Sequence, residues 1–68
     1  KMKFKPGDIM EWKGILHNEW TAFIVIRNCK FKRFEANSPE WFVYSESHGI
    51  TRHTEFALER FTYNLTTQ

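Results

Sequence analysis

The fold of this chain is decided by residues 41–53, which run Trp41-Phe42-Val43-Tyr44-Ser45-Glu46-Ser47-His48-Gly49-Ile50-Thr51-Arg52-His53. The first four of these residues are aromatic or β-branched, which is typical of a strand. Ser47-His48-Gly49 then supplies a tight turn, in which the glycine can take a positive φ. Residues 50–53 return as a second strand. This stretch therefore predicts a β-hairpin.

Two further strands are predicted on the N-terminal side of the hairpin. In residues 8–13 the apolar side chains of Met10 and Trp12 fall on one face and charged side chains on the other, as in a half-buried strand. Residues 20–27 are apolar almost throughout, which predicts a central strand covered on both faces or nearly so. Residues 29–35 are compatible with either a strand edge or a projecting loop.

On the C-terminal side, one helical turn and a last short strand are predicted. Thr54 can cap a segment that extends to Arg60, and this segment is too short for more than one turn, of α or 3₁₀ type. Residues 61–65 alternate again and predict the final strand. The expected core comprises Met10, Trp12, Ile24, Ile26, Val43, Leu58 and Phe61.

This order of elements resembles the SH3-like β-barrel superfamily. The opening Lys5-Pro6-Gly7-Asp8-Ile9-Met10-Glu11-Trp12 is similar to the first strand of many such domains, and the turn at residues 47–49 is similar to their distal hairpin. Within the superfamily, the Lys5-Pro6-Gly7-Asp8 start and residues 50–65 resemble short proteins of tailed bacteriophages, including those of cyanobacteria. The resemblance implies an all-β fold, in which residues 1–68 form one five-stranded barrel with a helical turn before the last strand. It predicts no particular function, because this barrel serves many unrelated roles.

The composition is that of a small domain that relies on its core. Seven Phe, three Trp and two Tyr give 18% aromatic residues, and the single cysteine, Cys29, excludes an internal disulfide. No apolar run has the length of a membrane span or of a signal peptide. We therefore expect a cytoplasmic protein, in the host cytoplasm if it is phage-encoded. We also expect that it needs no cofactor and that it is a monomer or a weak dimer.

The aromatic residues provide the first candidate site, a surface for a protein partner. Alternation puts Trp41 on one face of its strand, and Phe42 and Tyr44 on the other. A barrel needs only one inward face, so one of these sets should point outward. Core packing nevertheless accounts for many of the rings. The candidates for partner binding are Phe42, Tyr44, Trp41 and Trp20.

A basic and aromatic segment provides the second candidate site, for RNA or DNA. Cations can neutralise phosphates while an exposed phenylalanine stacks on a base. The alternative is a solvated connection whose charges keep it soluble, and it is favoured because the segment has only four cations, with Glu35 and Glu40 nearby. The candidates for nucleic-acid binding are Arg27, Lys30, Phe31, Lys32, Arg33 and Phe34.

Neither a metal site nor catalysis is expected. His48 and His53 are separated by a spacing that matches no common zinc motif. A nucleophile such as Cys29 would need a pocket and an orienting partner, for which so small a barrel has little room. The sequence thus favours a non-catalytic protein-interaction module that uses exposed aromatics and the loop before Trp41. The alternatives are RNA or DNA binding, and a structural subunit of a larger complex.

Overall fold

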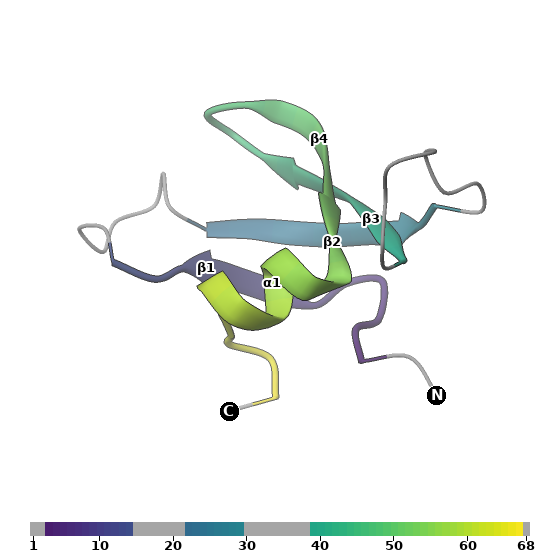
Figure 1. Ribbon diagram of the computed structural model, residues 1–68. Coiled ribbons are helices and arrows are strands. Elements are labelled where there is room, and N and C mark those ends of the chain that lie inside the picture. Colours follow the sequence, from purple (N-terminus) through teal and green to yellow (C-terminus); the bar gives the residue numbers. More distant parts are fainter. Residues whose placement is uncertain (1–2, 15–21, 30–38, 68) are drawn as a thin grey trace.

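The computed structural model describes residues 3–14, 22–29 and 39–67, which form a small, mostly β domain. Its elements are β1 (Ile9–Trp12), β2 (Ala22–Asn28), β3 (Glu40–Ser45), β4 (Gly49–Thr54), α1 (Glu55–Phe61) and β5 (Thr62–Asn64). The strands make one antiparallel sheet of five strands in the order β4-β3-β2-β1-β5 (Figure 1).

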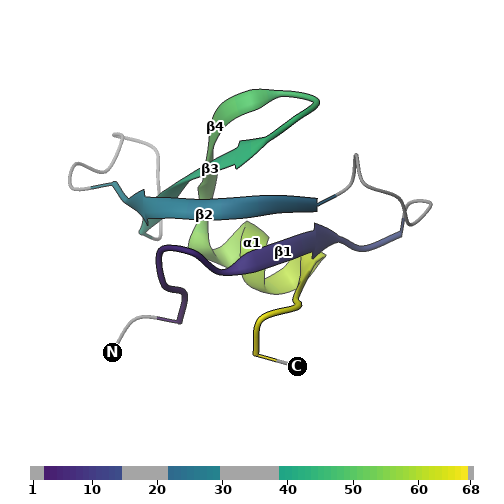
Figure 2. The same cartoon turned by 180° about the vertical axis from the view of Figure 1, so that it is seen from behind.

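The sheet is not closed into a barrel. β4 and β5 are its two edges, and α1, which joins them in sequence, contacts both. Figures 1 and 2 show α1 on one side of the sheet and the β3–β4 hairpin inclined steeply to β2. The predicted strand number and the helix before the last strand are confirmed. The predicted closure is wrong, because a helix rather than a strand ladder connects the two edges within the described residues.

The hairpin and the helix cap are confirmed in detail. β3 and β4 pair from Glu40 opposite Thr54 to Ser45 opposite Gly49, and Gly49 has a φ of 68°. A residue with a side chain is strained at such an angle, which explains the glycine there. The hydroxyl of Thr54 accepts a hydrogen bond from the backbone N–H of Ala57 at 3.1 Å. The segment after this cap is an α-helix of seven residues, longer than the single turn predicted.

One face of the sheet, together with α1, encloses the core. Side chains alternate along β2, so that Phe23 and Val25 point inward. The helix contributes Leu58, its one buried residue. The core cluster comprises Phe4, Met10, Phe23, Val25, Trp41, Val43 and Leu58, with Trp12 packed against it.

Three residues predicted to lie in the core are exposed instead. Ile24 and Ile26 belong to the face of β2 that α1 does not cover, so this strand is buried on one face only. Phe61, at the end of α1, is 50% exposed, and its ring lies near the guanidinium of Arg60. The predictions for Met10, Val43 and Leu58 are confirmed. An apolar run in sequence does not require cover on both faces when a single short helix provides the second layer.

The start of β1 is held by a buried carboxylate. Asp8 accepts hydrogen bonds at 3.0 Å from the backbone N–H of Lys5 and from the side-chain amide of Asn64 in β5. Gly7, with a φ of 95°, donates its backbone N–H to the carbonyl of Val25 at 2.8 Å. These contacts fix Ile9 beside both β2 and β5.

His53 in β4 should make stability depend on pH. Its ring packs edge-on against Trp12, with 5.1 Å between centroids, and burial lowers the pKa of His53 below its ordinary value of 6.5. The unfolded chain therefore binds this proton at a higher pH than the folded chain does. We predict that the free energy of unfolding falls as pH decreases from about 6.5 toward the folded pKa, by at most about 1.4 kcal/mol per pH unit.

Urea unfolding of the wild type and of His53→Gln at a series of pH values checks this prediction. Other groups also titrate in this range, so the informative quantity is the difference between the two proteins. We expect the gap in unfolding free energy to change with pH below about 6.5 and to be constant above about 7.5. A gap that does not vary with pH would show that His53 carries no linked proton.

Candidate functional site

A row of apolar side chains crosses the face of the sheet opposite the core. Strand register places Ile9 beside Ile24, and Ile24 beside Tyr44. Ile50 lies opposite Tyr44 across the hairpin. At the other end, the backbone N–H of Leu65 donates to the carbonyl of Ile9 at 2.8 Å, which continues the row beyond β5. We call these five residues the apolar row and this side of the sheet the outer face.

Every member of the apolar row is exposed to solvent. The exposed fractions range from 37% for Ile24 and Leu65 to 65% for Ile50. Single apolar side chains on a surface are ordinary, whereas a contiguous set marks an interaction site more often. This set is contiguous because the register aligns one apolar residue from each of β1 to β4 with Leu65, the residue directly after β5.

A basic cluster lies on one side of the apolar row. The ring of Phe42 in β3 is contacted from both neighbouring strands: the Cζ of Arg27 is 4.6 Å from its centroid, and the Cζ of Arg52 is 5.5 Å away. The register shifts between Val25 and Arg27, and this irregularity lets the consecutive residues Ile26 and Arg27 both be exposed. We call Arg27, Phe42 and Arg52 the basic cluster.

The two arginines of this cluster are held differently. Arg52 places its Nε and its second guanidinium nitrogen 3.0 Å from one carboxylate oxygen of Glu40, which is completely buried. Arg27 is exposed, and its guanidinium donates a 3.3 Å hydrogen bond to the carbonyl of Asn28. Arg52 thus belongs to the structural frame, whereas Arg27 is the cation offered to solvent.

The other side of the apolar row carries an exposed carboxylate beside β3. Glu46 is exposed at the hairpin turn, where it lines a shallow hollow together with Ile9 and Tyr44. Glu11 follows Ile9 by two residues and therefore points to the same face, although it is largely buried. Further toward β5, Lys13 lies over the ring of Tyr63. Beside β3, the outer face therefore carries the basic cluster on one side of the apolar row and the carboxylate of Glu46 on the other.

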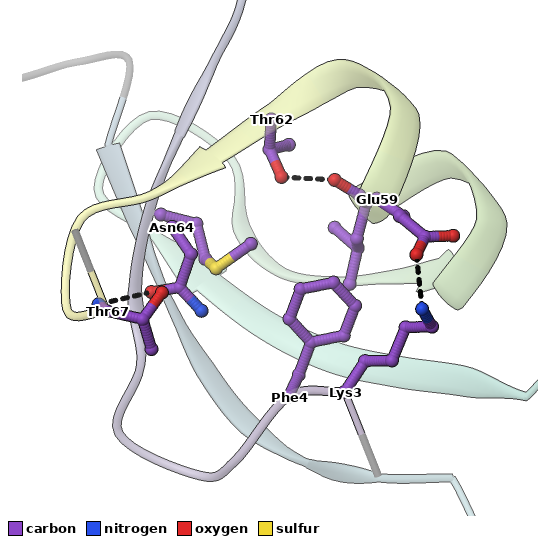
Figure 3. A pocket seen from close by; sticks show the side chains of 8 residues that line it. Lys3, Phe4, Glu59, Thr62, Asn64 and Thr67 are labelled. Carbon is purple, nitrogen blue, oxygen red and sulfur yellow. Dashed lines mark hydrogen bonds and ion pairs between the residues drawn. The ribbon is translucent and has the colours of Figure 1, made fainter.

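A second hollow lies on the core side of the molecule, between α1, β5 and the N-terminal segment (Figure 3). Its volume is about 350 Å³, near the lower end of the range for small-molecule sites. The apolar part of its lining consists of Phe4, Met10 and Leu58. The polar part decides whether it could bind a ligand.

Polar groups around this hollow are occupied by contacts within the chain. Lys3 pairs with Glu59 at 2.6 Å, and the hydrogen bond and charge of Glu59 raise the pKa of Lys3. The hydroxyl of Thr62 donates to the carbonyl of Leu58. The side-chain amide of Asn64 donates to the carboxylate of Asp8, and its oxygen accepts from the backbone N–H groups of Thr66 and Thr67. A small-molecule site normally presents polar groups that converge on the ligand. These groups instead fasten α1 and β5 to the rest of the fold.

The structure separates the four residues predicted to bind a partner. Phe42 and Tyr44 lie on the outer face, Phe42 half-buried and Tyr44 45% exposed. Trp41 points to the other face and is 0% exposed, packed edge-on against Phe4 at 6.1 Å between centroids. It is a core residue and not part of a binding surface, because the fold buries the Trp41 side of β3. Trp20 lies outside the described residues.

The predicted nucleic-acid segment is described only at its first residue. Arg27 contacts Phe42 and so joins a residue of the other predicted site. The remaining candidates, Lys30, Phe31, Lys32, Arg33 and Phe34, lie outside the described residues, as does most of the loop before Trp41.

Sequence reasoning missed most of the outer face. Ile50 and Arg52 could have been found, because the register of a short hairpin places them opposite Tyr44 and Phe42. Ile9 and Ile24 could not, because their alignment depends on how β1 pairs with β2 across a long connection.

The residues considered for metal binding or catalysis do not come together. His48 contacts Ser47 in the turn, His53 faces the core, and Cys29 is buried. Within residues 3–14, 22–29 and 39–67, no three His, Cys, Asp or Glu side chains are placed to hold a metal ion. In the same ranges, no helix has the length and apolarity that crossing a membrane requires.

No protein-family model, curated protein or solved structure matches this chain. A function must therefore be argued from the surface itself.

Proposed function

We propose that this chain is a non-catalytic protein-interaction module that binds a protein partner on its outer face. The observation that supports this proposal is the apolar row, which exposes one apolar side chain at each of five neighbouring positions across the sheet. Removing apolar surface from water contributes about 25 cal/mol per Å². Four of the five side chains are aliphatic, and such groups fit the apolar surface of another protein better than the π-faces of bases.

An SH3-like relationship forms part of the proposal. The strand order, the tight hairpin and the capped helix before β5 support it. The open sheet departs from a closed barrel, so the relationship concerns the path of the chain rather than complete closure.

RNA or DNA binding is the second candidate. The observation in its favour is that Arg27, at the start of the basic segment, lies beside the ring of Phe42. However, guanidinium groups from two strands already contact the ring of Phe42, and a stacking base would have to displace one of them. The candidate therefore ranks below protein binding.

Affinity capture tests the proposed function. We predict that the tagged wild-type chain recovers a defined protein from a host lysate, equally with and without nuclease, and that Tyr44→Glu loses at least about nine-tenths of it. The reason is that a charge in the middle of the apolar row would be buried without a partner, at a cost exceeding about 1.4 kcal/mol or tenfold in affinity. Quantitative mass spectrometry of the eluates measures the loss.

Phe61→Glu is the matched control, because Phe61 is an aromatic residue of similar exposure on α1, away from the outer face. It should leave recovery unchanged. Recovery that disappears on nuclease treatment would replace the proposal with nucleic-acid binding. That reading would be supported further if affinity for a labelled single strand fell steeply with salt. Equal losses for the two variants would argue against the outer face.

A further inference from the structure

We propose that the outer face binds a second copy of this chain, with the two copies face to face about a two-fold axis along the apolar row. The inference rests on the proposed function, because it names the occupant of the same face. It follows from the positions of three residues on β3 and the turn after it: Phe42, Tyr44 and Glu46.

The charge pattern of the outer face complements itself. Phe42 and Glu46 stand two residues before and two residues after Tyr44, on opposite sides of the apolar row. A two-fold rotation about the row exchanges those sides. Glu46 of each copy then lies over Phe42 of the other, between Arg27 and Arg52, which contact that ring from the neighbouring strands. In such an isologous contact one surface serves both partners, and the pairing occurs twice.

The other face-to-face arrangement is disfavoured by the same charges. The alternative two-fold axis would run parallel to the strands, between β2 and β3. It would place Arg27 of each copy over Phe42 of the other, and the two Arg27 side chains would then lie close together. It would also leave Glu46 away from the basic cluster. Like charges facing each other across an interface repel and so disfavour the wrong arrangement. The pattern thus selects the axis along the apolar row.

The apolar row supplies the centre of the proposed contact. Rotation about the row sets Ile24 and Tyr44 of one copy against the same residues of the other, with the charged groups at the rim. A standard interface buries about 800 Å² per partner, roughly a sixth of the 5093 Å² surface of this chain. Because the β3–β4 hairpin is inclined to β2 (Figure 2), contact is confined to the middle of the sheet. We therefore expect a weak dimer, with a Kd between about 1 μM and 1 mM.

Sedimentation velocity of the full chain tests this inference. The wild type should dimerise as its concentration is raised to about 1 mM, and Tyr44→Glu should weaken the dimer at least about tenfold. High salt should weaken the wild-type dimer as well, because its rim pairs are exposed to solvent. Circular dichroism and thermal melting establish that each variant is folded, and Phe61→Glu is again the control that should dimerise like the wild type.

A charge exchange makes the test specific for the proposed axis. Arg27→Glu makes the basic side acidic, and Glu46→Arg makes the acidic side basic, so each single change should raise the Kd at least about tenfold. The double variant Arg27→Glu/Glu46→Arg restores opposite charges across the two-fold axis. Its Kd should return to within about threefold of the wild type. If the double variant loses as much free energy of dimerisation as the two single variants together, the proposed arrangement is wrong.

Two further outcomes separate this inference from the proposed function. The wild type could stay monomeric at all concentrations and still recover a lysate protein in a manner that depends on Tyr44. That outcome would rule out the dimer and leave the proposed protein-binding function in place. A dimer that Tyr44→Glu does not weaken uses another face, which also overturns the inference. If that variant changes neither dimerisation nor lysate capture, both proposals fail.

Discussion

Trp41→Ala is expected to remove a large share of the free energy of unfolding of this protein. Trp41 is 0% exposed, and it connects the N-terminal segment to α1, with its ring against Phe4 and its indole N–H donating to Glu55 at 3.3 Å. Truncating a fully buried tryptophan to alanine costs about 3–5 kcal/mol. A chain of 68 residues has a total stability of only roughly 3–10 kcal/mol. Urea unfolding followed by far-ultraviolet circular dichroism measures the loss.

Phe61→Ala is the control for this prediction. The sequence predicted Phe61 for the core and Trp41 for partner binding, but Phe61 is half-exposed and Trp41 is buried. Its truncation should cost less than about 1 kcal/mol. Equal losses for the two variants would contradict the burial pattern described above, and with it the assignment of the two faces of the sheet.

Arg52→Met is expected to cause the second large loss of stability. Arg52 meets the completely buried carboxylate of Glu40 at 3.0 Å through two of its nitrogens. Methionine fills part of the same space without the charge, so the buried carboxylate loses its cation. Breaking a buried ion pair from one side costs about 3–5 kcal/mol. Chemical unfolding of the wild type and the variant under identical conditions measures the difference.

Two comparisons identify the buried charge as the cause. The double variant Glu40→Gln/Arg52→Met removes both charges and should regain at least about 1 kcal/mol relative to Arg52→Met. Glu59→Gln breaks the exposed pair of Glu59 with Lys3, and it should have little measurable effect because solvent screens that pair. A double variant no more stable than Arg52→Met would show that the effect comes from lost packing.

The burial of Glu40 also guides the choice of surface substitutions. A change at Arg52 alters the fold and the outer face together, so its effect on binding could not be assigned to either. Arg27 carries the same charge beside the same ring, but it is exposed. It is therefore the better probe of the basic cluster.

Features that depend on neighbouring residues could be predicted from the sequence. The hairpin at residues 41–53 requires a turn with glycine at a positive φ and flanking residues that favour strands. The capped helix requires a threonine hydroxyl in reach of the N–H three residues later. Both are local, so a single sequence contains what is needed to find them.

The faces of the strands could not be assigned in this way. Alternation in β2 separates Phe23 and Val25 from Ile24, but both sets are apolar. The sequence pattern would look the same if the two faces of β2 were exchanged. Only the packing of α1, through Leu58, decides which set of side chains is buried. The packing of α1 on this face also buries Trp41 and leaves Tyr44 exposed, so these two residues of the predicted partner site lie on opposite faces of the sheet.

The number and order of the elements, the hairpin and the cap of α1 follow from the residue pattern, because each of these is set by interactions over a few residues. The tertiary structure alone decided the closure of the sheet, its inner and outer faces, and the alignment of Ile9, Ile24 and Tyr44 in one row. These depend on which distant segments pair and on where a single short helix lies. The candidate interaction surface is therefore a product of strand register and one-sided cover, which no stretch of the sequence contains on its own.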